Sequence, residues 1–358
     1  MYAISAADCI SPAMDRTRTL LFRPFNWGTY LKLCLVAVIT ESMGGNFNSS
    51  RNFGRSTGNG THNFPNFHFT PEMIAIIVGS AAAVLILGLV IAYLVTRLRF
   101  AYFHCLIHNL REIAPGWRIY KDQATRFFWL NVGVGLGFLL LVILIAIPFA
   151  AGFVRLFRDT PMGSQPDWGV LLSLVLPLIP IILVLALAGF ATKVVLRDFM
   201  LPHYALENAT AGQAWGAAWS RIMAEKGAFF VYALLRVILP IGAGIAMFLI
   251  LFLPALLFAG VTAGVEVALH AAFAQATGAG VVAGIALQVF FGAIAFLVAL
   301  FVWICVAGPV STWIRQFALL FYGGRYPALG VILYPPPMAP VTPTAPYTPA
   351  PPFAPGIG

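Results

Sequence analysis

Two histidines in this sequence have a spacing that could hold a metal ion. His104 and His108 are four residues apart and flank Cys105, and this spacing places two imidazoles on one side of a helix. No HExxH pattern and no second ligand cluster accompanies them. A polar stripe at the edge of a helix is therefore favoured, and the sequence predicts no metal site and no cofactor.

Catalytic signatures are missing in the same way. The chain has no GxSxG pattern, no phosphate-binding loop and no pair of carboxylates at catalytic spacing. We expect no catalytic residue and no enzyme activity.

Basic side chains form a second group with chemical potential. Arginine and lysine bind phosphate through charge-assisted hydrogen bonds. The candidates for contacts with anionic lipid headgroups are Arg99, Arg118, Lys121, Arg197 and Arg221. The alternative is that these charges only set the topology and attract anionic lipid without specificity, at about 1 kcal/mol per charge.

A third group consists of charges inside apolar runs, namely Lys32, Glu41 and Arg236. Charges within a membrane are costly and usually face a partner or a cavity, so these three could line a polar transport path. The alternative is that Arg236 and Lys32 extend to the nearby membrane surface while Glu41 lies at the outer interface.

The composition places these side chains in a membrane protein. Hydrophobic residues make up 60% of the 358 residues and charged residues only 9%, against roughly 25% charged in soluble domains. Most Lys and Arg residues lie beside apolar runs, so the net charge of +9 indicates membrane topology and anionic lipid, not nucleic acid.

The apolar runs predict an all-α integral membrane protein with six transmembrane helices in a domain of residues 1–333. A span needs about 20 apolar residues. The predicted spans are 27–43, 73–95, 128–153, 170–194, 229–256 and 281–306. The fifth run continues to about Gly264 and contains Pro240 and Pro254. One long kinked helix is favoured there, and a span followed by a re-entrant or surface segment is the alternative.

The distribution of Lys and Arg predicts the topology. Under the six-span assignment, fifteen of these residues fall on one side of the membrane and four on the other. Loops rich in Lys and Arg stay in the cytoplasm, so both termini are predicted to be cytoplasmic.

Two polar stretches repeat one pattern, Arg99–Trp117 and Arg197–Trp215, and 314–317 echoes its beginning. The aligned pairs are Arg99 with Arg197, Phe100 with Phe199, His104 with His203, and Asn109 with Asn208. We interpret each copy as leading into an amphipathic helix in the membrane interface, and a helix over 5–22 supplies the first such element. The predicted interfacial anchors are Trp27, Trp117, Trp215 and Trp219. Three hairpin units would then repeat about an axis along the membrane normal.

Two segments do not belong to the predicted bundle. Residues 44–70 are rich in Gly, Asn and Ser and predict a flexible extracytoplasmic loop. Residues 334–358 contain ten prolines and no charge, which predicts a disordered cytoplasmic tail. The alternative for this tail is a ligand for a protein partner with an aromatic groove.

Two junctions resemble a known family. They are AWSRIMAEKGAFFVYALLRVIL, Ala218–Leu239, and MDRTRTLLFRPFNWGTYLKLCLVAVI, Met14–Ile39. They resemble uncharacterised bacterial polytopic membrane proteins related to the membrane domain attached to some glycerophosphodiester phosphodiesterases. The resemblance covers about residues 5–330 and implies a helical fold in the bacterial inner membrane. The hydrolase activity does not carry over, because the chain has no segment for the catalytic barrel.

Three functions remain open from the sequence. The favoured one is a non-enzymatic protein that organises the membrane or associates with lipid. A transporter or channel-like protein is the alternative, and a water-filled cavity that reaches Arg236 would favour it. A membrane-embedded enzyme would require His104, His108 and His203 to converge with Asp198 or Glu207 around a pocket.

Overall fold

The computed structural model describes residues 5–42, 71–159, 168–275 and 277–334. All regular secondary structure in these ranges is helical. The predicted loop at 44–70 and nearly all of the predicted tail at 334–358 lie outside the described residues.

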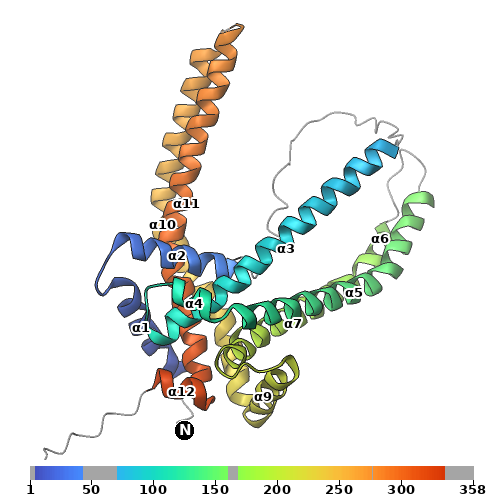
Figure 1. Ribbon diagram of the computed structural model, residues 1–358. Helices are drawn as coiled ribbons and strands as arrows, with labels where there is room; N and C mark the ends of the chain where they lie inside the picture. Colours follow the sequence, from blue (N-terminus) through green and yellow to red (C-terminus); the bar gives the residue numbers. More distant parts are fainter. Residues whose placement is uncertain (1–4, 43–70, 160–167, 276, 335–358) are drawn as a thin grey trace, which may run out of the picture.

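The helices form two arms that diverge from a common base (Figure 1). The long arm consists of α10 (Lys226–Phe273) and α11 (Ala279–Gly323). The four-helix arm consists of α3 (Pro71–His108), α5 (Lys121–Asp159), α6 (Trp168–Val175) and α7 (Leu178–Val194). The base holds the 3-10 helix η1 (Ala7–Cys9), α1 (Ile10–Phe22), α2 (Trp27–Ser42), α4 (Ala114–Ile119), the π-helix η3 (Val195–Met200), α8 (Leu201–Leu206), α9 (Ala211–Ala224) and α12 (Pro327–Leu333).

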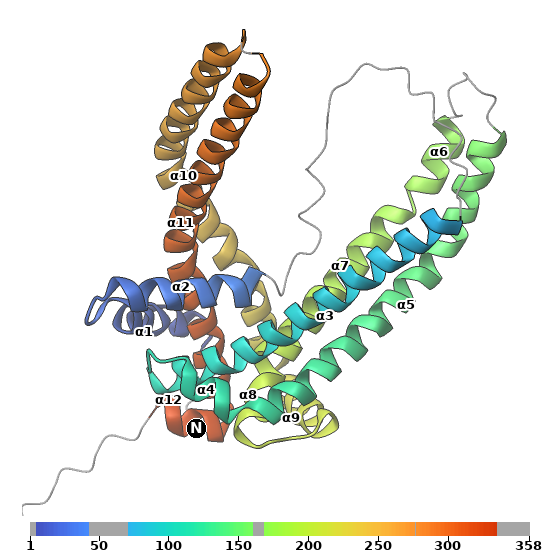
Figure 2. The same cartoon turned by 45° about the horizontal axis from the view of Figure 1, so that its top comes forward.

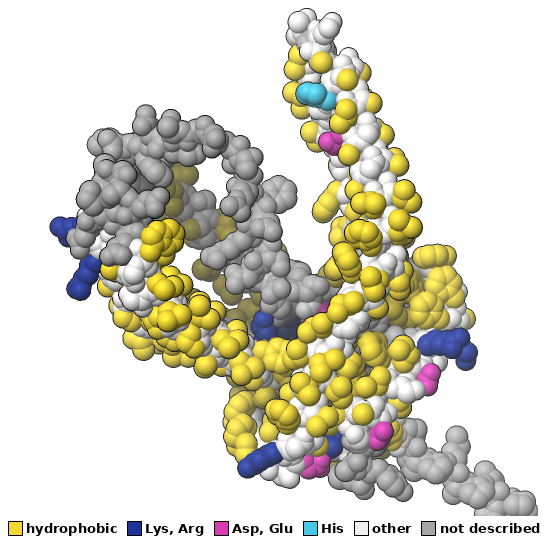
Figure 3. Space-filling model, turned by 180° about the vertical axis from the view of Figure 1, so that it is seen from behind, with side chains coloured by type: hydrophobic (Ala, Val, Ile, Leu, Met, Phe, Trp, Pro, Cys, Tyr) yellow, Lys and Arg dark blue, Asp and Glu magenta, His cyan; other side chains and the backbone are white. Residues whose placement is uncertain are grey.

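The arms have the surface expected of helices in lipid. Among the described residues, five helical stretches are long and apolar enough to cross a membrane, and the most apolar 18-residue window of each has no buried residue. They are Pro71–His108, Lys121–Leu156, Trp168–Leu206, Lys226–Phe273 and Ala279–Gly323. Hydrophobic side chains dominate the surface of both arms, with few charged ones among them (Figure 3).

The predicted first span, 27–43, is not among these five. It corresponds to α2, which has 16 residues and is therefore about 24 Å long, shorter than the roughly 30 Å hydrocarbon core of a bilayer. This helix lies across the base against α11 (Figure 2). The predicted count of six spans is therefore not confirmed.

The helices are longer than the predicted spans, since α3 and α11 continue into the base beyond residues 95 and 306. The clearest case is α10, a single helix of 48 residues that contains both Pro240 and Pro254. The structure therefore has one long helix here instead of a span followed by a re-entrant segment.

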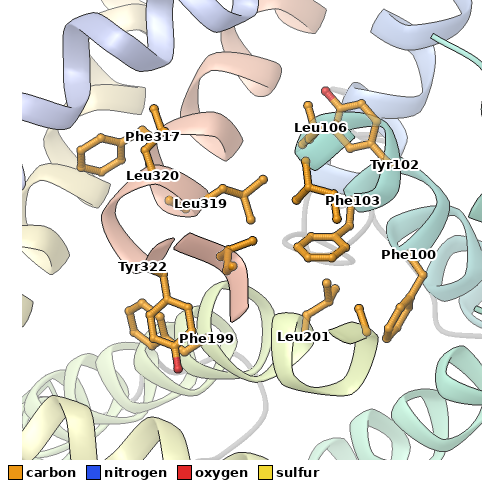
Figure 4. Close-up of a cluster of buried hydrophobic side chains, with 14 of the residues drawn as sticks. Phe100, Tyr102, Phe103, Leu106, Phe199, Leu201, Phe317, Leu319, Leu320 and Tyr322 are labelled. Carbon is orange, nitrogen blue, oxygen red and sulfur yellow. The ribbon is translucent and has the colours of Figure 1, made fainter. Parts of the chain in front are cut away.

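The core lies in the base, where the repeated stretches meet. Phe100, Phe199 and Phe317 are 0%, 3% and 0% exposed, and they come from α3, η3 and α11. Figure 4 shows their neighbours, including Tyr102, Leu106, Leu201 and Tyr322, packed in one cluster. The three copies of the pattern thus supply much of the hydrophobic core.

The two longer copies also share a local backbone geometry. Asn109 follows α3 and Asn208 follows α8, and their φ angles are +53° and +52°. Asparagine tolerates this left-handed conformation better than most residues, and it commonly ends a helix there. The short helices α4 and α9 then lead into α5 and α10. In the first unit α1 leads into the short α2, so a threefold repeat of complete hairpins is not confirmed.

The predicted interfacial tryptophans lie near the base. Trp27, Trp215 and Trp219 are 63%, 47% and 47% exposed. Trp117 is partly buried, and the guanidinium of Arg97 lies 4.4 Å from its ring centroid.

One close contact fixes α2 against α11. A Cβ atom added to Gly308 of α11 would lie 2.7 Å from the Cα atom of Cys34 in α2. Only glycine allows the two backbones to approach this closely.

We predict that Gly308→Ala lowers the free energy of unfolding by about 1–3 kcal/mol, because the added methyl group forces α2 away from α11. Unfolding of the purified protein in mixed micelles measures the effect. Gly88→Ala is the matched control, since a Cβ there meets no atom within 4 Å and alanine favours the helix. Equal stability of the wild type and Gly308→Ala would contradict the prediction.

Candidate functional site

The site is centred on Asp198, a residue that lies between Arg197 and Phe199 as Gln316 lies between Arg315 and Phe317. In the first copy Arg99 is followed directly by Phe100. The chain forms the π-helix η3 around Asp198. The Asp198 side chain lies in the base, where it is 0% exposed.

The carboxylate of Asp198 joins three helical elements. Its Oδ2 atom accepts hydrogen bonds from Nε of Arg236 at 3.1 Å and from the hydroxyl of Tyr232 at 2.8 Å, both in α10. Its Oδ1 atom accepts a hydrogen bond from Nη1 of Arg315 in α11 at 2.6 Å. Arg315 also donates through Nη2 to the carbonyl oxygen of Arg197 at 2.9 Å. The carboxylate thereby connects η3 to both helices of the long arm.

A second carboxylate reaches the cluster from α2. Glu41 forms ion pairs with Arg197 and with Arg236, the latter at 3.7 Å between Oε2 and Nη2. Two carboxylates thus contact three arginines.

The cluster closes one end of a cavity of about 900 Å³ between α5 and α7. This volume is within the range of roughly 300–1,000 Å³ that is usual for small-molecule sites. The walls are mainly apolar and are formed by Phe127, Val134, Phe138 and Val142 of α5 and by Ile182, Leu185, Ala186 and Phe190 of α7. From Phe127 to Val142 the wall extends about 22 Å at the rise of an α-helix.

The polar end of the cavity is rich in arginine. Arg99, Arg197, Asp198 and Arg236 line it together with Lys193. Arg99 differs from the other arginines because its Nε atom is buried without a hydrogen-bond partner, and no ion pair of Arg99 occurs in the described part of the chain.

The charges do not balance. Four guanidinium groups, those of Arg99, Arg197, Arg236 and Arg315, lie around two carboxylates, which leaves an excess of two positive charges. Uncompensated charge away from water is costly. The polar end of the cavity therefore favours an anion.

The structure separates the five predicted headgroup candidates. Arg99 and Arg197 line the cavity together. Arg118 and Lys121 are exposed and are not part of its lining. Arg221 instead lies 3.3 Å from Nε2 of His203 and over the ring of Tyr326.

The predicted intramembrane charges are also separated. Arg236 and Glu41 contact each other in the cluster, whereas Lys32 is exposed on α2. Arg236 is only 9% exposed, because Asp198 and Glu41 enclose its guanidinium group in the cluster.

Three members of the cluster were not selected from the sequence: Asp198, Tyr232 and Arg315. A signal for two of them was present. Asp198 is a carboxylate that directly follows a repeated arginine, and Arg315 is the counterpart of Arg99 and Arg197 in the third copy. Nothing in the sequence marked Tyr232, because its hydrogen-bond partner Asp198 is 34 residues away.

The histidines do not form a common site. His203 is hydrogen-bonded through Nδ1 to Glu207 at 3.0 Å and through Nε2 to the hydroxyl of Tyr322 at 2.7 Å. His104 contacts His108, with ring centroids 4.7 Å apart, and Tyr120. Among the described residues no group of three or more His, Cys, Asp or Glu side chains could hold a metal ion.

The network around His203 is electrostatically coupled. Burial acts to raise the pKa of Glu207, but the hydrogen bond from His203 and the positive charge of Arg221 outweigh it and leave the pKa below its usual value. Glu207 therefore carries its charge and holds the ring of His203 in place.

Long apolar helices facing outward, with a charged cluster buried at their base, indicate an all-helical integral membrane protein. More particularly, the chain belongs to DUF7544, a family of unknown function whose model matches residues 4–332. No curated protein and no solved structure matches the chain. The expected relation to the membrane domain of glycerophosphodiester phosphodiesterases finds no support in these comparisons.

We predict that Asp198→Asn lowers the free energy of unfolding by about 3–5 kcal/mol, since it leaves Arg236 and Arg315 buried without their shared counterion. Unfolding in mixed micelles measures the loss. Asp15→Asn provides the control, because Asp15 is exposed on α1 and its replacement should change stability by no more than about 0.5 kcal/mol. Similar stability of the two variants would show that the cluster does not hold the base together.

Proposed function

We propose that this protein is a non-enzymatic membrane protein that holds an anionic lipid in the cavity between α5 and α7. The observation that carries the proposal is the division of the cavity into two parts. One end presents arginines, and the long walls are apolar. This is the chemical pattern of a molecule with a negatively charged head and a hydrocarbon tail.

The location of the cavity supports a ligand that arrives from the bilayer. Ile182 lines the cavity and is 57% exposed, and it belongs to an apolar stretch that is long enough to cross a membrane. The cavity is thus continuous with the face that lipid would cover. A lipid can enter sideways without leaving the hydrophobic phase.

We also propose that the base lies on the cytoplasmic side of the bacterial inner membrane. The described chain begins and ends in the base (Figure 1), and most of its Lys and Arg residues lie in or next to the base in sequence. The positive-inside rule then favours cytoplasmic termini. The arginine end of the cavity would face the inner leaflet.

A transporter is the second candidate, and one observation favours it: the cavity reaches Arg236. Movement of a fluorescent anionic lipid between the leaflets of reconstituted vesicles distinguishes the two functions. A protein that only holds lipid leaves the rate at that of protein-free vesicles. Accelerated movement that is abolished by blocking the cavity would favour the transporter.

The lipid-holding function predicts a sharp difference between two neighbouring glycines of α5. Gly135 lines the cavity and a Cβ there meets no atom within 4 Å, and the same open space surrounds Gly137, which is not in the lining. The two positions are about 200° apart around the helix. Gly135→Phe should fill the cavity, whereas Gly137→Phe should face the bilayer.

We predict that Gly135→Phe lowers lipid retention about tenfold, because overfilling an occupied space costs about 1–3 kcal/mol. Native mass spectrometry of protein released gently from detergent measures the lipid that remains bound. Gly137→Phe should retain as much as the wild type. Equal retention by all three proteins would exclude the cavity as the binding site.

A further inference from the structure

The polar end of the cavity has features that select among anionic headgroups. We propose that it binds a terminal phosphate monoester, a headgroup that carries two negative charges, at the end of a hydrocarbon chain. This inference rests on the proposed function, because it assigns the headgroup of the lipid held between α5 and α7.

The first argument is charge. The cluster has an excess of two positive charges, since Asp198 and Glu41 compensate only two of its four arginines. A phosphate monoester carries a charge of about −1.5 to −2 at neutral pH. A phosphodiester or a carboxylate carries one negative charge and would leave positive charge uncompensated in an apolar setting.

The second argument is the number of available donors. A guanidinium group has five N–H donors. In Arg236 only Nε and Nη2 contact carboxylates, and in Arg197 only Nη2 does so. Arg99 has a buried Nε without a partner. These three side chains line the same end of the cavity, and a terminal phosphate offers three oxygens to accept from them.

The third argument is that the donors come from different parts of the fold. Arg99 belongs to α3, Arg197 to η3 and Arg236 to α10. A compact group with acceptors in three directions can contact all of them. A planar carboxylate has only two oxygens, so it can satisfy fewer of these donors.

The apolar walls require a chain attached to the phosphate. They extend about 22 Å along α5, which matches a long hydrocarbon tail. The same headgroup occurs on a two-chain lipid, phosphatidic acid, and on a single-chain prenyl monophosphate. Free inorganic phosphate has the head without the tail.

The test compares lipids that differ by one methyl group. Full-length protein in detergent is incubated with equal amounts of dioleoyl phosphatidic acid and its phosphate methyl ester, and native mass spectrometry measures the bound fraction of each. The methyl ester keeps the phosphate and both chains but has a single negative charge. We expect phosphatidic acid to bind at least about fivefold better, from roughly 1 kcal/mol for the additional charge.

Variants of Arg99 test whether this side chain recognises the second negative charge of the phosphate monoester. Arg99→Gln should reduce the preference to less than about twofold, and Arg99→Lys should keep most of it because the positive charge remains. Arg99 has no counterion in the described structure, so neither variant leaves a buried carboxylate without a partner. Arg118→Gln is the matched control and should leave the preference unchanged, since Arg118 is exposed and outside the cavity.

Two further ligands identify the source of the phosphate. A long-chain prenyl monophosphate that binds better than its own methyl ester supports the proposal and indicates that the headgroup is recognised on either type of chain. Failure of the prenyl compound, with phosphatidic acid still preferred, supports the proposal for the two-chain lipid. Inorganic phosphate that displaces phosphatidic acid at equal concentration would overturn it, because the tail would then contribute nothing.

The remaining outcomes separate this inference from the function on which it rests. Equal binding of phosphatidic acid and its methyl ester, with both reduced in Gly135→Phe, would overturn the phosphate monoester and leave the lipid site intact. Binding of neither lipid to the wild type would overturn both.

Discussion

The buried carboxylate of Asp198 is the interaction on which the base of this protein depends. It binds Arg236 and Arg315 from the two helices of the long arm, while its own backbone belongs to the π-helix that follows α7. Helices in lipid have no hydrophobic force that drives them together, so polar contacts and close packing must fix their arrangement. The arms diverge above the base, and a shared charge cluster at their junction supplies the specific contact that apolar surfaces cannot. Removal of water from these charges is costly, and the cluster offsets that cost only because each carboxylate contacts more than one arginine.

The repeated sequence pattern brings its arginines to this junction. Arg99, Arg197 and Arg315 occupy equivalent positions in the three copies, and all three approach the same point. The aromatic residues that follow them form the core shown in Figure 4. Repetition of one pattern thus brings arginine and aromatic side chains to the same junction. Asp198 follows one of the repeated arginines, Arg197, and its carboxylate pairs with another, Arg315, and with Arg236 of α10.

The sequence predicted the long apolar helices, since runs of hydrophobic residues directly report contact with lipid. It did not predict where these helices end, because a helix that continues from lipid into a protein core changes its composition only gradually, as α3 and α11 do. It also predicted α2 as a span, which the structure does not confirm. Composition cannot distinguish a short apolar helix packed on a neighbour from one that crosses the bilayer, and the contact between Gly308 and Cys34 joins residues 274 positions apart in the chain.

The candidate site was predicted in part for similar reasons. Arg99 and Arg197 were identified because repetition marked them, and Arg236 because it lies in an apolar run. Of their two counterions, Glu41 was among the candidates and Asp198 was missed, since the pairing of Asp198 with Arg315 depends on the crossing of α11, which is not visible in local spacing. Arg118, Lys121 and Arg221 have the same chemistry as the arginines of the site, but they point elsewhere. Residue type therefore restricted the candidates for the site to basic side chains, and only the fold shows which of them line the cavity.

The position of the cavity gives its two ends different roles. Arginines from α3, η3 and α10 meet at the polar end, so a headgroup bound there would touch both arms. The apolar walls belong mainly to α5 and α7, so a tail bound there would touch mainly the four-helix arm. Changes at Gly135 therefore affect the tail without disturbing the junction, whereas changes at Arg197 or Arg236 remove an ion pair of the base together with a ligand contact. Arg99 is the exception among the arginines of the lining: its side chain has no counterion in the described structure, and it can report on the headgroup while Asp198 and Glu41 keep their partners.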